Sequence, residues 1–227
     1  MKRITLTLAL LLSFTFAGLA QQAPQPTAKA AQTPLEATVT KFTTARSIAE
    51  VQLTANDFER LSLSETSNWL PSYYASLVNT LMAFTEKDLA KKDALLDKAE
   101  KFYEQTAKLE PKNEEVEVLH ANIANARITV DPNKRWKKYG EIVESSLRKA
   151  EKLNPNNPRV TLLKAQNIFY TPKEYGGGTD KALPIVKESL AQFKTFQPAS
   201  SVHPSWGQDQ AKQILLACQK TTSTTTK

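Results

Sequence analysis

The chain has 227 residues, 41% hydrophobic and 23% charged, with a formal net charge of +7. This composition is typical of a globular protein that is large enough to bury a core. One cysteine and two histidines exclude a disulfide framework, a thiolate zinc site and a three-histidine metal site, so we expect neither a metal nor a cofactor.

The first twenty residues have the three-part pattern of a secretory signal peptide. Lys2 and Arg3 precede an apolar run over 4–16, and small residues follow up to Ala20. The run is shorter than the roughly 20 residues that a membrane-spanning helix needs. We therefore predict a signal peptide over 1–20, a periplasmic location and no membrane span after cleavage.

Charge is mixed along the rest of the chain. Without Lys2 and Arg3 the net charge falls from +7 to +5, and basic and acidic residues alternate over 86–98. Such mixing is typical of a solvated helix face, whereas a nucleic-acid-binding surface clusters basic residues. We expect no nucleic-acid partner.

Apolar spacing predicts an all-α protein. Val116, Leu119 and Ile123 recur at intervals of three and four residues, which places them on one face of a helix. We predict a flexible leader over 21–34, a helical domain over 35–220 and a disordered polar tail over 221–227. The domain is expected to contain about eight helices, near 36–62, 68–86, 88–110, 114–130, 134–153, 158–170, 180–196 and 205–219.

Two stretches of the helical domain are similar to each other. Each ends a helix with a Lys-Leu-(Glu/Asn)-Pro-(Lys/Asn)-Asn sequence, at Pro111 and at Pro155, and each is followed by a new amphipathic helix. The helices carry small residues where close packing would need them, at Ala99, Ala121, Ala150 and Ala165.

These residues resemble the tetratricopeptide repeat (TPR) family over roughly residues 65–196. The segments 68–74, 156–159 and 175–178 also resemble a group of exported TPR-like proteins of Gram-negative bacteria. The resemblance implies helix–turn–helix repeats stacked as a short right-handed α-solenoid, and it implies no reaction. The alternative is a helical bundle without repeats.

The TPR resemblance also implies a ligand groove lined by the first helix of each repeat. The matching positions are Tyr74, Asn122, Asn125, Arg159, Gln166 and Tyr170. Asn122 and Asn125 point away from the stripe through Ile123, so we expect both to be exposed. Asn and Arg side chains could hold a peptide backbone or carboxylate. The alternative is that these are ordinary surface residues.

The large aromatic residues have a different expected place. Because stacked helices bury such rings, we expect the core to contain Trp69, Tyr73, Trp136 and Trp206.

The sequence contains no recognisable catalytic motif, so we predict no catalytic residues. Gly176-Gly177-Gly178 lacks the Lys-Ser/Thr of a phosphate-binding loop, and we predict a tight turn with Asp180 as helix cap. His120 is the only histidine near Glu117, too few for a zinc-protease motif, and is expected to pack between helices.

Together these observations predict an exported, non-enzymatic TPR-like scaffold that binds a protein or peptide in the cell envelope. One alternative is a structural or assembly subunit of an envelope complex. A minor alternative is an enzyme whose site forms only in three dimensions.

Overall fold

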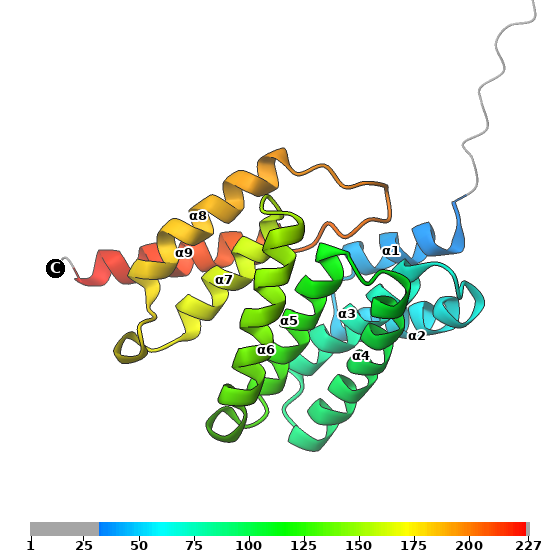
Figure 1. The fold of residues 1–227 in the computed structure, drawn as a ribbon, viewed down its shortest axis with the longest axis horizontal. Coiled ribbons are helices and arrows are strands. Elements are labelled where there is room, and N and C mark those ends of the chain that lie inside the picture. Colours follow the sequence, from blue (N-terminus) through cyan, green and yellow to red (C-terminus); the bar gives the residue numbers. More distant parts are fainter. Residues whose placement is uncertain (1–31, 226–227) are drawn as a thin grey trace, which may run out of the picture. The chain divides into compact units, whose positions relative to one another are not determined.

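The computed structural model describes residues 32–225, with side chains up to residue 221. The predicted signal peptide and residues 21–31 of the predicted leader lie outside the described residues. Within residues 32–225 the chain is helical without strands (Figure 1). The helices are α1 (Pro34–Thr44), α2 (Ile48–Ser64), α3 (Trp69–Thr85), α4 (Leu89–Leu109), α5 (Glu114–Ile128), α6 (Pro132–Leu153), α7 (Pro158–Tyr170), the 3-10 helix η1 (Lys173–Tyr175), α8 (Thr179–Thr195) and α9 (Gln208–Thr225).

Side-chain caps determine where several of these helices begin. The Asn113 and Asn157 side chains accept the backbone N–H groups of Glu115 and Arg159, each at 2.9 Å, and so cap α5 and α7. These bonds satisfy donors that a helix start leaves free. The predicted starts at 114 and 158 are therefore confirmed.

The first predicted helix, over 36–62, is wrong in one respect, because the structure contains two helices there. The chain bends after Thr44, and α2 begins at Ile48 with Ser47 as its cap. The Ser47 hydroxyl accepts the N–H of Glu50 at 3.2 Å, and the Glu50 carboxylate accepts the N–H of Arg46. This cap satisfies the donors of a new helix start and so favours the break.

The last helix is longer than predicted. α9 continues to Thr225, so the prediction of a disordered tail over 221–227 is wrong for residues 221–225. The hydroxyl of Thr221 donates to the carbonyl of Ala217 at 3.1 Å, a bond that a helix allows and that composition alone does not predict. Residues 226–227 lie outside the described residues.

Successive helices pair as hairpins: α3 with α4, α5 with α6, and α7 with α8 (Figure 1). α5 also contacts α3, α4 and α7, so it is covered on almost every side. Four small residues allow this close approach and are fully buried, as predicted: Ala99, Ala121, Ala150 and Ala165.

The segment 196–207, between α8 and α9, connects distant parts of the fold; we call it the strap. The indole N–H of Trp206 donates to the hydroxyl of Tyr73 at 2.8 Å, and the Tyr74 hydroxyl donates to the carbonyl of Val202 at 2.9 Å. Burial raises the pKa of both tyrosines, so they remain neutral hydrogen-bonding groups. The strap thereby links the start of α9 to α3.

Three of the four aromatic residues expected in the core pack there. Tyr73 is fully buried, and Trp69 and Trp206 are half-buried against the apolar clusters. The expectation for Trp136 is wrong, because its side chain is 63% exposed. It lies in the first turns of α6, whereas the buried residues of that helix, such as Val143, Leu147 and Ala150, lie further along it.

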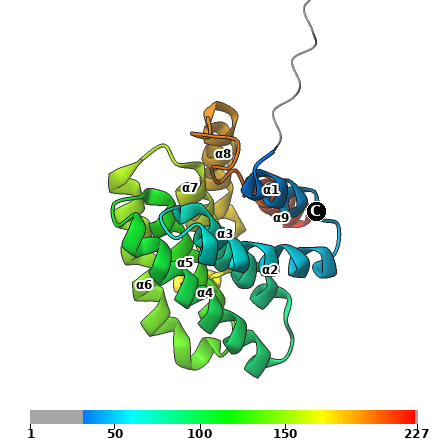
Figure 2. The same ribbon diagram turned by 90° about the vertical axis from the view of Figure 1, so that its right-hand side faces the viewer.

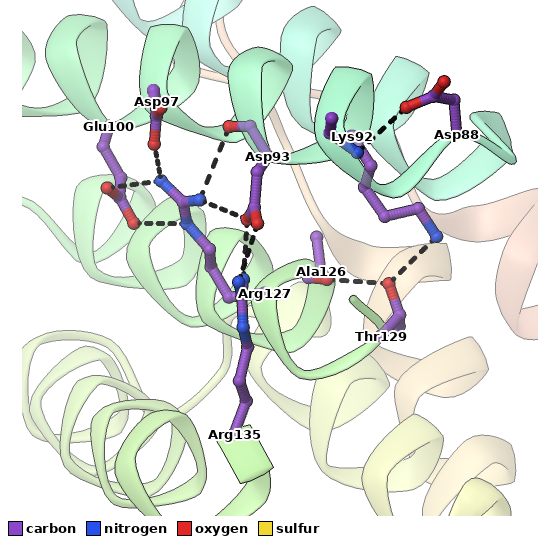
Figure 3. A network of polar contacts seen from close by, with 10 residues as sticks. Asp88, Lys92, Asp93, Asp97, Glu100, Ala126, Arg127, Thr129 and Arg135 are labelled. Carbon is purple, nitrogen blue, oxygen red and sulfur yellow. Dashed lines mark hydrogen bonds and ion pairs between the residues drawn. The ribbon is translucent and has the colours of Figure 1, made fainter. Parts of the chain in front are cut away.

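A polar cluster joins α4, α5 and α6 around Arg127 (Figure 3). The nearly buried guanidinium donates to Asp93 at 2.6 Å and to Glu100 at 2.8 and 2.9 Å, and it also bonds to Asp97. Arg135 on α6 donates to the two oxygens of Asp93 at 2.6 and 2.7 Å. The cluster therefore fixes three helices with charge-assisted hydrogen bonds.

Candidate functional site

The six residues predicted to line a groove do not form one surface. Tyr74 and Arg159 are buried, with 2% and 0% of their area exposed, so neither can meet a ligand in this conformation. Tyr74 stacks on Phe58 with ring centres 4.9 Å apart. Asn122 is 5% exposed, so the prediction that it is exposed is wrong; α5 is covered by neighbouring helices on the face that carries it.

The other three members of the predicted groove differ in exposure. Asn125 on α5 and Gln166 on α7 are half-buried, while Tyr170 at the end of α7 is 75% exposed. Because Tyr74, Asn122 and Arg159 are closed off, the residues that remain do not make a continuous peptide groove.

Arg159 instead forms a buried ion pair. Its Nε donates to Oε2 of Glu115 at 2.8 Å, and neither side chain is exposed. Its guanidinium also lies 4.5 Å from the ring centre of Phe196 in the strap. Burial alone would lower the pKa of Arg159, but the attraction of the Glu115 carboxylate and the hydrogen bonds that Arg159 donates to it outweigh this cost and raise the pKa. Arg159 is therefore a structural cation that joins α5, α7 and the strap.

The remaining chemical candidates have packing roles. The His120 ring stacks on Tyr103 with ring centres 4.4 Å apart, and its Nδ1 lies 3.0 Å from the Ser146 hydroxyl. Burial lowers the pKa of His120, which favours the neutral ring. The expectation of a helix-packing histidine is confirmed.

The glycine-rich turn is also structural. Gly176 and Gly178 have φ values of 90° and 113°, as the predicted turn requires. The predicted cap is wrong: Gly178 occupies the cap position, and Asp180 lies within the first turn of α8.

An open hollow lies where α1 meets α2, the end of the helix array that Figure 2 faces. It has a volume of about 740 Å³, and a second hollow of about 400 Å³ adjoins it. The two share Lys41, Asp57 and Arg60. We call them together the α1–α2 hollow, and their volumes lie in the range of small-molecule sites.

The lining of the α1–α2 hollow combines apolar side chains with three cations and two carboxylates, those of Glu50 and Asp57. Leu53 is 65% exposed and contributes apolar surface, and the cations are Lys41, Arg46 and Arg60. Lys41 lies 3.5 Å from Oδ2 of Asp57, while Arg60 bonds to Oδ1 of the same carboxylate. Asp57 therefore holds two of the cations side by side. Lysine and arginine have further donors beyond those that Asp57 uses, so the hollow could take an apolar molecule that carries carboxylates.

Sequence reasoning missed this hollow, since it depends on the bend at residues 45–47. One signal was available: Ser47 and Glu50 have the spacing of a capping box, which marks a helix start. A start at Ile48 would have separated α1 from α2 and placed Leu53 in the second turn of α2.

Within residues 32–225 no helix combines the length and apolarity needed to cross a membrane. The same part of the chain contains no group of three or more His, Cys, Asp or Glu side chains placed to hold a metal ion.

No protein-family model matches the chain, and no curated protein matches it. Among solved structures, the chain is similar to the HusA haemophore from Porphyromonas gingivalis, with 32% sequence identity and a TM-score of 0.73. The similarity covers 83% of this chain and 92% of the haemophore chain.

Proposed function

The chain belongs to the same protein family as the HusA haemophore, and from this premise we propose that it is a secreted, non-enzymatic haem-binding protein. The observation that carries the proposal is the 32% identity sustained over 92% of the haemophore chain. The proposal replaces the protein or peptide partner expected from the sequence with a small-molecule cargo.

The α1–α2 hollow supports this cargo. Haem is a flat, largely apolar macrocycle with two propionate carboxylates at one edge. Leu53 and the aliphatic stems of Lys41 and Arg60 would pack against the ring. The lysine and arginine head groups would pair with the propionates, with Arg60 able to make a two-pronged contact.

The described lining of the α1–α2 hollow contains no His, Met, Cys or Tyr. The side chains present there fit the macrocycle and its carboxylates, and offer none of the usual axial ligands of haem iron. The proposed contacts are therefore ring packing and propionate pairing.

The finer fold prediction, a right-handed TPR-type solenoid, also belongs to the proposal. The sequential pairing of α3–α4, α5–α6 and α7–α8, each in contact with the next pair, supports it. Such an array is stabilised by contacts between neighbours, and within the described residues α1 and α2 form its first pair.

Haem titration tests the function. The protein beginning at Gln21, the form expected after signal cleavage, is mixed with haem while the Soret absorbance band is followed. We expect a saturable change in the band with one haem per chain. A spectrum equal to that of free haem at every protein concentration would contradict the proposed function.

Secretion is tested separately. We expect cells that express the full chain to deliver the protein, shortened at Ala20, outside the inner membrane. N-terminal sequencing of periplasmic and medium fractions checks this. Full-length protein confined to the cytoplasm would contradict secretion without bearing on haem binding.

A further inference from the structure

Exposed aromatic side chains gather at one edge of the hairpin stack. The turns that close hairpins α3–α4, α5–α6 and α7–α8 follow one another along one side of the helices (Figure 1). We call this the hairpin-turn edge and define it as residues 84–91, 129–138 and 170–175. Within residues 32–221 the hairpin-turn edge contains all four exposed large aromatic residues: Phe84 (40% exposed), Trp136 (63%), Tyr170 (75%) and Tyr175 (79%). It also carries the exposed Leu89.

The opposite edge provides the contrast. There the connections α2–α3, α4–α5 and α6–α7 carry two exposed large apolar residues, Leu63 and Leu153, and no exposed large aromatic residue within the described chain. The two edges are built from the same kind of helix end, so the aromatic residues are not a consequence of the fold. Most of the Trp136 side chain is exposed to solvent, whereas Tyr170 packs one edge against Phe169 with ring centres 4.9 Å apart.

The hairpin-turn edge is also rich in exposed lysine: Lys87, Lys91, Lys134, Lys137, Lys138 and Lys173. Lys137 and Lys138 form no ion pair with any described residue. The edge also carries four acids, Glu86, Asp88, Asp131 and Glu174. Two of its lysines are paired, since Lys134 lies 3.4 Å from Asp131 and Lys173 lies 3.6 Å from Asp180. Asp88 accepts backbone N–H groups at the start of α4, and Asp131 does so at the start of α6.

We propose that the hairpin-turn edge docks the protein onto the surface of a lipid bilayer that carries anionic headgroups. Trp and Tyr rings settle at the boundary between headgroups and acyl chains, because one end of each ring is apolar and the other is polar. Lysine head groups are attracted to anionic lipid while their stems reach along apolar surface. Contact is peripheral, made by turns and helix ends.

Docking leaves the cargo site free. The α1–α2 hollow is lined by residues 34–64, none of which belongs to the hairpin-turn edge. Docking on lipid does not require bound haem. Lipid binding by the protein without haem therefore tests docking separately from the proposed function.

Vesicle sedimentation tests the proposal with the protein that begins at Gln21. We expect it to sediment with vesicles of phosphatidylcholine mixed with phosphatidylglycerol, and far less with phosphatidylcholine alone. The double variant Lys137→Glu, Lys138→Glu should bind these vesicles at least about fivefold more weakly. The double variant Trp136→Ser, Tyr175→Ser should weaken vesicle binding by a similar factor.

Matched controls come from the opposite edge and from exposed lysines elsewhere. Two double variants should sediment like the unchanged protein: Leu63→Ser, Leu153→Ser and Lys101→Glu, Lys152→Glu. Circular dichroism establishes that each variant is folded. Equal sedimentation with both kinds of vesicle, or equal losses in the edge and control pairs, would overturn the proposal. A protein that docks on a protein receptor instead of lipid would give the first of these results.

Discussion

Arg159 on α7 donates to the carboxylate of Glu115 on α5, and both side chains are completely shielded from solvent. Asn157, the cap of α7, bonds to the same carboxylate. Phe196 and the backbone carbonyl of Trp206 contact the guanidinium from the strap. One buried charge pair thus joins two hairpins and the long connection that precedes α9.

Breaking this pair should be costly. Arg159→Met leaves the Glu115 carboxylate buried without its cation, so we expect the free energy of unfolding to fall by about 3–5 kcal/mol. Urea denaturation followed by circular dichroism measures the loss. The double variant Arg159→Met with Glu115→Leu should be more stable than Arg159→Met alone, because no charge remains buried. If it is no more stable, the pair is not what makes Arg159 important.

The glycine turn before α8 gives a second prediction. A side chain on Gly177 would place its Cβ 2.0 Å from the carbonyl oxygen of Thr171, so Gly177→Ala should destabilise the protein by about 1–3 kcal/mol. Gly140, inside α6, has nothing within 4 Å of such a Cβ. Gly140→Ala should therefore stabilise by roughly 0.5–1 kcal/mol. Thermal melts of the two variants should shift in opposite directions.

Acid should weaken the Arg127 cluster. The hydrogen bond from Arg135, with that from Arg127, outweighs partial burial and lowers the pKa of Asp93 from its ordinary value. A carboxyl whose folded pKa is depressed stabilises the protein above its unfolded pKa, and this contribution is lost as the pH falls through the folded value. Stability should thus decline below about pH 4, and Asp93→Asn should flatten that decline. Denaturation midpoints measured from pH 6 to pH 2 check this; equal slopes would contradict it.

Local rules of the sequence predict most helices of this fold. Apolar spacing, Asn caps at 113 and 157, and small residues such as Ala121 and Ala165 place α3 to α8 within a few residues of their observed bounds. These signals are local, since each depends on a few neighbouring side chains. Because the cap at Ser47 was not recognised, the prediction merged α1 and α2 into one helix.

The site could not be predicted in the same way. Whether Asn122 is exposed depends on how many helices surround α5, and whether Trp136 is covered depends on how far α6 extends past its neighbours. The pairing of Arg159 with Glu115 joins residues 44 positions apart. A clue existed, because Glu115 lies on the same helix face as Leu119 and Asn122, but a carboxylate in a first helical turn is also an ordinary surface feature.

The most direct test of the account compares haem dissociation constants for two triple variants. Lys41→Glu, Arg46→Glu and Arg60→Glu reverse the cations of the α1–α2 hollow, while Lys101→Glu, Lys152→Glu and Lys194→Glu make the same charge change on exposed lysines elsewhere. We predict at least a tenfold weaker haem affinity, roughly 1.4 kcal/mol, for the first variant and little change for the second. Equal affinities would contradict a haem site in the α1–α2 hollow.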